Sequence, residues 1–297
     1  MSLGLRAGRH NALAPRLRIL DPSSGAFVRE AGLESSHPPP DGDQAAVPHF
    51  DGTWVWQPTR TAIHRVDPST LASTQVLTHR LFHDVHSVAP GKRGWLITCT
   101  GHEAVVEMDL DGHVHHRWDL GPRLDDAMDG RQLPHDHFKP HSVHPNYAFV
   151  ENGKRWVTSL AQGCCVGLDH EGRLELGSAH PHDGVLREGL RWFTLTSGRV
   201  LGLDPATGQV ERDLDVAALE SESGAFGWCR GVEVVGDRLW VGITCLRGSP
   251  WRETARRVVR GPRQPTRVVE LNWRTGALVH RWPVAPEGSL YAITALV

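Results

Sequence analysis

Short runs in which apolar and polar residues alternate recur along the whole chain, and turn residues separate them. Alternation with a period of two places one face of an extended strand in a core and the other in solvent. The separating turns combine Asp or Asn with Pro or Gly, which favour tight reversals of the backbone. They occur within residues 18–28, 64–74, 107–116, 166–176, 201–211 and 269–280. Each turn therefore predicts an antiparallel hairpin.

A short strand with a Trp near its beginning precedes most of these hairpins. These strands cover residues 53–59, 94–100, 155–161, 191–197 and 239–245. A further β-rich segment lies upstream of four of them, at 86–90, 141–145, 182–186 and 230–234. The repeating unit thus has four antiparallel strands and returns after roughly 40–50 residues, as in the blades of a β-propeller.

The number of hairpins predicts an all-β fold, a six-bladed β-propeller that forms a single domain over residues 1–297. The N-terminal segment, up to about Leu33, supplies three strands of a blade without the innermost one. The C-terminal segment 290–297 resembles a lone innermost strand. We expect these two ends to close the ring by sharing one blade.

Composition and charge exclude several partners. The net charge of −2 gives no overall attraction to nucleic acid or to an anionic membrane surface. No run of 18 apolar residues is present, and the N-terminus carries Arg6 and Arg9 where a signal peptide needs an apolar core. We expect a cytoplasmic protein whose five cysteines are free thiols.

Histidine is concentrated in one part of the chain, with 14 of the 19 residues between His79 and His182. Alignment of the innermost strands on Val88, Val143 and Val185 places His86, His141 and His182 at comparable levels of three adjacent blades. Three imidazoles that converge from rigid strands favour a metal centre with an open coordination position. Fe, Cu or Zn would suit these ligands, and we prefer Fe.

Other polar residues lie close to these strands. We expect His83, His137 and His180, with Glu233 of a later blade, to be catalytic residues near the metal. Asp84, Asp136 and Asp183 adjoin histidines and could fix the tautomers of the ligands, whereas His135 and His144 are expected to be bystanders. An alternative remains open, in which the repeated histidines only form structural hydrogen bonds between blades.

Three long connections should project from the face that carries the histidines, at 33–46, 121–138 and 246–266. The connection 246–266 contains six arginines. We expect Arg252 and Arg256 to bind an anionic small-molecule substrate, because guanidinium groups recognise carboxylate, sulfate and phosphate. A solvated basic helix or a subunit contact is the alternative interpretation. The oligomeric state is left open.

Residues 83–120 resemble a blade of the arylsulfotransferase-like propellers, in the His-Asp start of the inner strand and the Asp-x-x-Gly hairpin. This resemblance implies a histidine that carries a sulfuryl group, with further His and Arg residues around it. The carotenoid oxygenases offer a similarity of site only, with iron held by axial histidines. The leading hypothesis is a metal-dependent enzyme, an oxidoreductase or a Lewis-acid catalyst. A histidine-based group transferase and a non-enzymatic binding scaffold are the alternatives.

Overall fold

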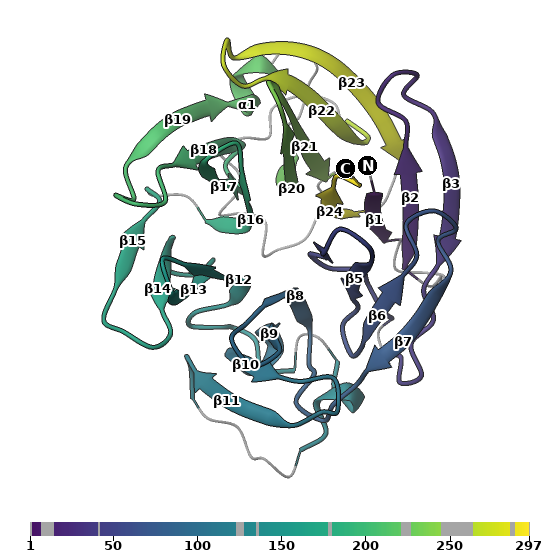
Figure 1. The fold of residues 1–297 in the computed structure, drawn as a ribbon, viewed down its shortest axis with the longest axis vertical. Coiled ribbons are helices and arrows are strands. Elements are labelled where there is room, and N and C mark those ends of the chain that lie inside the picture. Colours follow the sequence, from purple (N-terminus) through teal and green to yellow (C-terminus); the bar gives the residue numbers. More distant parts are fainter. Residues whose placement is uncertain are drawn as a thin grey trace.

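A computed structural model shows four-stranded antiparallel sheets arranged around a central axis (Figure 1). It describes residues 2–6, 15–40, 42–122, 128–134, 137–177, 180–220, 227–244, 264–285 and 289–296. In each sheet one strand lies nearest the axis and another forms the rim (Figure 1). This is the arrangement of a β-propeller, so the predicted all-β propeller of four-stranded antiparallel blades is confirmed.

Five sheets are built from consecutive strands, as the repeating hairpins predicted. The first contains β4 (His49–Phe50), β5 (Val55–Pro58), β6 (Ile63–Val66) and β7 (Ser73–Leu77). The second contains β8 (Val85–Pro90), β9 (Trp95–Cys99), β10 (Ala104–Met108) and β11 (Val114–Asp119). The third contains β12 (Pro145–Glu151), β13 (Lys154–Ser159), β14 (Cys164–Gly167) and β15 (Arg173–Glu175).

The next two sheets follow in the same order around the axis. One contains β16 (Pro181–Arg187), β17 (Leu190–Leu195), β18 (Arg199–Leu203) and β19 (Val210–Asp215). The other contains β20 (Trp228–Val235), β21 (Arg238–Thr244), β22 (Thr266–Asn272) and β23 (Ala277–Ala285). Successive inner strands contact one another, β8 with β12, β12 with β16 and β16 with β20.

A further sheet joins the two ends of the chain. It consists of β1 (Ser2–Arg6), β2 (Arg16–Leu20), β3 (Phe27–Gly32) and β24 (Ser289–Thr294). The C-terminal β24 pairs with β1 and also packs against β20 of the preceding sheet. The N-terminal strands therefore receive their inner neighbour from the other end of the sequence.

Local turn chemistry accounts for the hairpins. In the β6–β7 turn the carboxylate of Asp67 accepts a hydrogen bond from the Ser69 N–H at 2.7 Å. In the β18–β19 turn Asp204 accepts one from the Ala206 N–H at 2.7 Å, and Gly208 has a φ of +73°. A side-chain acceptor followed by a residue with positive φ closes each reversal without help from distant contacts.

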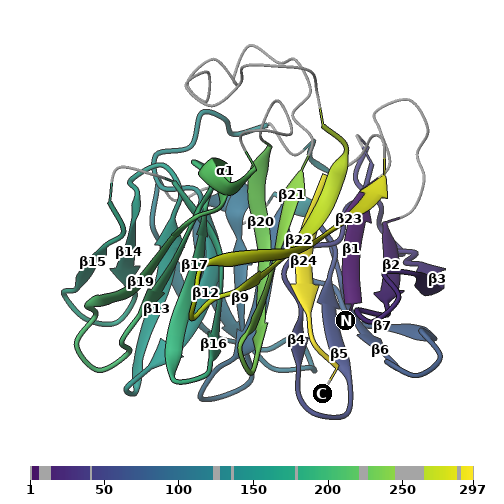
Figure 2. The ribbon, with the colours of Figure 1, turned by 90° about the horizontal axis from the view of Figure 1, so that it is seen from above.

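Few helical segments interrupt the sheets in the described part of the chain. They are the 3₁₀ turns η1 (Thr100–His102) and η2 (Gly130–Gln132) and the short helix α1 (Val216–Leu219), which lies at one end of the sheets (Figure 2). Within the described residues, no helix is long and apolar enough to cross a membrane. Of the three long connections, 33–46 and 121–138 are described in large part, whereas residues 245–263 lie outside the described residues.

The core lies between neighbouring sheets, where large side chains from one sheet pack on the next. Trp192 is fully buried there and meets Trp273 edge to face, with 5.4 Å between ring centroids. Four of the five cysteines are buried free thiols, as expected, and the fifth, Cys245, lies outside the described residues. These interfaces hold the inner strands in fixed positions around the axis.

Candidate functional site

Four successive inner strands carry a β-bulge close to their beginning. The ladder register shifts after Val85 in β8, after Pro145 in β12, after Pro181 in β16 and after Cys229 in β20. In each strand one extra residue follows, and bulges commonly re-aim side chains next to functional sites. The residues that follow the four shifts, here called the bulge level, are His86, Asn146, His182 and Arg230.

Histidine rings gather at and beside the bulge level. The centroids of His86 and His182 are 5.9 Å apart although a whole blade lies between their strands. The centroid of His144 is 5.6 Å from that of His86, and His141 contacts His144 at 4.8 Å. These four residues, the axial histidine cluster, come from three neighbouring blades.

The expected equivalence of His141 with His86 and His182 is wrong. The structure places Asn146 at that ladder position, because β12 begins at Pro145 and its bulge follows directly. His141 lies four residues before β12, and its Nδ1 lies 2.6 Å from that of His144. His144, which we expected to be a bystander, is the residue of this blade that contacts His86.

A shared backbone conformation explains how His144 reaches the axis. His144 has a φ of +53°, and Asp84, two residues before the bulge-level residue of its own blade, has a φ of +52°. Asp and His adopt this left-handed conformation more readily than most residues do. In the sequence, His144 stands two residues before Asn146, as Asp84 stands two residues before His86. This correspondence becomes visible only once the β12–β13 ladder shows that Asn146 is the bulge-level residue.

Hydrogen bonds at Nδ1 fix the tautomers of His86 and His182. His86 Nδ1 lies 2.8 Å from the backbone oxygen of Asp84, and His182 Nδ1 lies 2.5 Å from a carboxylate oxygen of Asp183. Both acceptors require a proton on Nδ1, which leaves the Nε2 lone pair of each ring free to bind a cation. His144 Nδ1 lies 2.6 Å from His141 Nδ1, so one of these two rings donates to the other.

Burial keeps the rings neutral. It lowers the pKa of His86 to about 4, with smaller contributions that lower it from His182 and Arg230. Burial also lowers the pKa of His182, and it lowers that of His144 well below its usual value, with His86 and His141 adding to the effect. Neutral imidazole is the form that binds metal ions, so no proton has to be displaced at neutral pH.

The predicted acidic partners of the histidines have different roles. Asp183 is buried and bridges two blades, since its second oxygen accepts the N–H of Gly231. The Asp84 carboxylate instead pairs with the buried Arg60 at 3.3 Å and lies 4.0 Å from His86 Nδ1. Asp136 lies outside the described residues, as does His135.

Two of the expected catalytic histidines form a separate group near the connection 121–138. His83 is buried and lies 2.9 Å from the backbone oxygen of Pro134 through Nε2, and its ring meets His102 at 5.2 Å. His137 is exposed and packs edge-on against Phe138 at 4.5 Å. The structure thus places His83 beneath this connection and His137 on its surface.

The remaining predicted residues are also separate from the axial cluster. His180 is exposed and bonds to the backbone oxygen of Leu160 at 2.6 Å. Glu233 is buried in β20, three residues after the bulge-level Arg230, and pairs with Arg187 of β16 at 2.8 Å. Arg252 and Arg256 lie outside the described residues.

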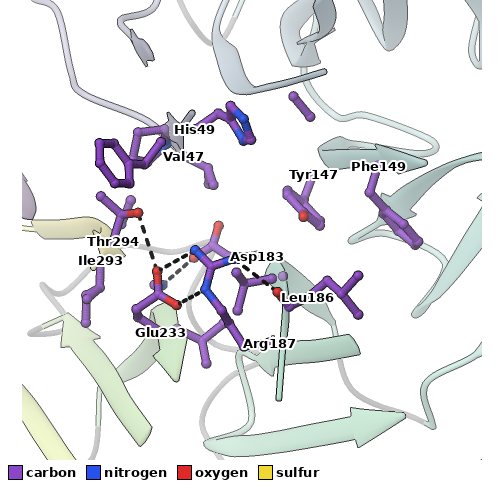
Figure 3. A pocket seen from close by; sticks show the side chains of 18 of the residues that line it. Val47, His49, Tyr147, Phe149, Asp183, Leu186, Arg187, Glu233, Ile293 and Thr294 are labelled. Atoms are coloured by element: carbon purple, nitrogen blue, oxygen red, sulfur yellow. Dashed lines mark hydrogen bonds and ion pairs between the residues drawn. The ribbon is translucent and has the colours of Figure 1, made fainter. Parts of the chain in front are cut away.

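A cavity of about 260 Å³ occupies the axis next to Glu233 and Arg187 (Figure 3). Its walls come from β8, β12, β16, β20 and β24 and from the residues around β4, and they expose polar and apolar surface in nearly equal parts, with His49 and Tyr147 among the polar groups. Asp183 and Gly231 also line the cavity, and each is next in sequence to a bulge-level residue. The cavity is thus lined by residues next in sequence to the bulge level, although none of the four cluster histidines lines it.

A compact set of three metal-ligand atoms occurs elsewhere in the described residues. Only Asp109, Asp111 and His113, in the exposed β10–β11 turn, bring three such atoms within 4.8 Å of one another. The carboxylate of Asp109 there accepts the N–H groups of Asp111 and His113, so the turn itself explains this set. The nitrogen atoms of the axial histidine cluster do not converge as closely as this in threes.

Comparisons with known proteins show the fold and no activity. No protein-family model matches the chain, and no curated protein is significantly similar to it. A protein of unknown function from Bacteroides caccae has a TM-score of 0.61 at 11% identity, over 98% of this chain and 97% of its own. A chain of a nidogen/laminin complex has a TM-score of 0.61 at 12% identity, over 98% and 96%. Neither finding supports the resemblance to arylsulfotransferases.

Proposed function

We propose that the axial histidine cluster binds a transition-metal ion through His86, His144 and His182, and that the protein is a metal-dependent enzyme. The observation that carries this proposal is the meeting of three neutral rings from three blades. The ring centroid of His86 is 5.6 Å from that of His144 and 5.9 Å from that of His182. The substrate we propose is a small anionic molecule.

The ring spacing supports a shared ion. A ring that binds a metal through Nε2 at about 2.1 Å has its centroid about 3.2 Å from the ion. Two such rings at tetrahedral to trigonal angles have centroids about 5.2–5.5 Å apart. The observed spacings exceed this range by a few tenths of an ångström, so modest rotations of the rings would let their nitrogen atoms converge.

The surroundings favour ligands rather than structural hydrogen bonds. Asp84, Asp183 and His141 each engage the Nδ1 side of one ring, which is how ligating histidines are held in metalloproteins. Three imidazoles leave an open position, where the ion could bind substrate and act as a Lewis acid or a redox centre. Imidazole suits Fe, Cu and Zn, and we keep Fe as the preferred ion.

The ring closure belongs to the same proposal. We take the propeller to have six blades, closed by β24 on the N-terminal strands, which the β24–β1 ladder supports. A closed ring fixes the inner strands relative to one another, and a preformed metal site requires this rigidity.

A histidine-based group transferase is the second candidate. His182 and the buried carboxylate of Asp183 form a dyad at 2.5 Å, the arrangement that activates an imidazole as nucleophile or base. In this alternative His182 would accept a group from an anionic donor without a metal ion.

The metal content of purified protein tests the leading proposal. Protein loaded with Fe²⁺ without oxygen, or with Zn²⁺ or Cu²⁺, is dialysed and its metal is measured by mass spectrometry. We expect about one ion per chain in the wild type and in the control His116→Ala, whose ring is exposed on β11. His144→Ala should lose the ion while its circular dichroism is unchanged.

The variants also separate the alternatives. His141→Ala should keep the ion with an affinity about 10- to 100-fold lower, because it removes only the partner of a ligand. Equal metal content in the wild type and in His144→Ala would refute the metal centre. A wild type that binds no metal but is labelled on His182 by a sulfuryl or phosphoryl donor would support the transferase. A wild type that neither binds metal nor is labelled would support a binding scaffold.

A further inference from the structure

The bulge level contains a buried amide that no described part of the chain satisfies. The side chain of Asn146 is fully buried, and neither its Oδ1 nor its Nδ2 has a hydrogen-bond partner in the described part of the chain. Buried amides are nearly always hydrogen-bonded, because leaving them unpaired costs free energy. This amide therefore needs a partner that is not part of the described chain.

The position of Asn146 indicates where that partner lies. β12 is the inner strand between β8 and β16, so Asn146 stands between His86 and His182 at the same ladder level. The rings of those two residues meet across this position at 5.9 Å. The backbone of Asn146 is fixed, since its carbonyl accepts a hydrogen bond from Thr98 of the preceding blade at 3.2 Å.

The fourth bulge-level residue adds a positive charge. Arg230 begins the same bulge in β20 as His182 does in β16, and the next residue, Gly231, donates its N–H to Asp183. The Arg230 charge reaches both rings, since it contributes to the lowered pKa of His86 and of His182. A positive charge at the same ladder level as neutral imidazoles favours an anion there.

We propose that Asn146 and Arg230 bind the carboxylate and the adjacent hydroxyl group of a small hydroxycarboxylate at the bulge level. This inference rests on the proposed metal centre, whose open position takes one oxygen of the same ligand. Arg230 pairs with the carboxylate, and the Asn146 Nδ2 donates to it. The Asn146 Oδ1 accepts from the hydroxyl group, so both unsatisfied atoms of the amide are used.

The axial cavity provides space beside the bulge level for the rest of such a ligand. Its lining reaches Asp183 and Gly231, the neighbours in sequence of His182 and Arg230, and includes apolar side chains such as Val88 and Ile293. The polar head of the ligand would lie at the bulge level and its remaining carbon atoms in the cavity.

Cobalt-loaded protein tests the inference without an activity assay, because Co²⁺ gives visible absorption that reports on its ligands. Wild type, Asn146→Ala, Asn146→Asp and Arg230→Lys are titrated with glycolate, acetate and acetamide. The wild type should bind glycolate at least about tenfold more tightly than acetate, and acetamide not measurably. In Asn146→Ala this preference should fall at least about fivefold.

The other variants separate the two residues. Arg230→Lys should weaken glycolate and acetate by the same factor, because it affects only the carboxylate. Asn146→Asp, nearly equal in size to the wild type, should lose glycolate binding by charge repulsion while it retains Co²⁺. The matched controls Arg274→Met and Asn152→Gly, both on exposed turns, should behave as the wild type does.

The other possible results would refute either the binding of a hydroxycarboxylate or the metal centre itself. Wild-type protein that binds Co²⁺ but shows the same glycolate preference as Asn146→Ala overturns this inference and leaves the metal centre intact. Wild-type protein whose Co²⁺ binding does not depend on His144 overturns the metal centre, and the inference with it. A large loss of thermal stability in metal-free Asn146→Ala would show that the amide is structural, and would also overturn it.

Discussion

Glu103 holds the turn that carries His144, so its replacement tests how the axial cluster is positioned. Its carboxylate accepts the N–H groups of Val143 and His144, and the hydroxyl group of Ser142 at 2.9 Å. Glu103 belongs to the preceding blade, where it follows η1 with a φ of +49°. One carboxylate thus fixes the entry of the chain into the next blade.

The expected cost of Glu103→Gln can be worked out from these contacts. Hydrogen bonds to a charged group contribute about 1.5–3 kcal/mol each, and neutral ones about 0.5–1.5 kcal/mol. The glutamine oxygen can still accept from the two N–H groups, and the Ser142 hydroxyl can reverse its role. Loss of the charge from two bonds should therefore lower the free energy of unfolding by about 2 kcal/mol.

Glu103→Ala should cost more, because two N–H groups lose their acceptor. We expect about 3–5 kcal/mol from the unsatisfied donors and the lost side-chain packing. Urea unfolding followed by Trp fluorescence measures both values. Glu188→Gln is the matched control, since the exposed Glu188 accepts only the Gly236 N–H at 2.9 Å and should change stability by less than about 0.5 kcal/mol.

The pH dependence of the free energy of unfolding provides a second test of the role of Glu103. Burial alone would raise the pKa of Glu103, but the hydrogen bonds from Val143, His144 and Ser142 outweigh it, and the pKa lies below 4.5. The unfolded chain thus binds this proton first, so the stabilisation by Glu103 is present above pH 4.5 and is lost as the pH falls through the lower folded value. Glu103→Gln should lack this part of the acid dependence. If it unfolds at the urea concentration of the wild type at every pH, the assigned role of Glu103 is refuted.

Three other changes should have distinct effects. Asp183→Asn should lower metal affinity about 10- to 100-fold, measured by competition with a chelator, because it removes the charged partner of His182. His64→Gln should reduce the loss of stability as the pH falls below 6.5, since burial lowers the pKa of His64 and the unfolded chain therefore binds its proton at a higher pH than the folded chain does. Arg187→Met should cost about 2–3 kcal/mol in urea unfolding, because it leaves the buried Glu233 without its charged partner.

Each of these expectations has a contradicting result. Unchanged chelator competition in Asp183→Asn would separate this carboxylate from the cluster. Parallel stability curves against pH for the wild type and His64→Gln would mean that His64 is protonated in the folded protein. A stable Arg187→Met would show that the N–H groups of Val234 and Ala295, at 3.0 and 2.9 Å, satisfy Glu233 by themselves.

The repeating blade could be read from the sequence because its causes are local. Alternation sets which face of each strand is buried, and residues such as Asp67 and Gly208 close the turns by their own chemistry. The sharing of one sheet by the two chain ends also followed from counting strands. The concentration of histidines correctly marked the blades that build the axial cluster.

Which side chains meet at the axis depends on the register of the strand ladders, and only the tertiary structure decides that register. A bulge adds one residue, and a shift of one residue turns a side chain to the opposite face of a strand. For this reason His144 and Asn146, rather than His141, occupy the positions beside His86 and His182. Local pattern determined the blades of this protein, whereas hydrogen-bond ladders and the packing of separate blades determined which side chains meet at its axis.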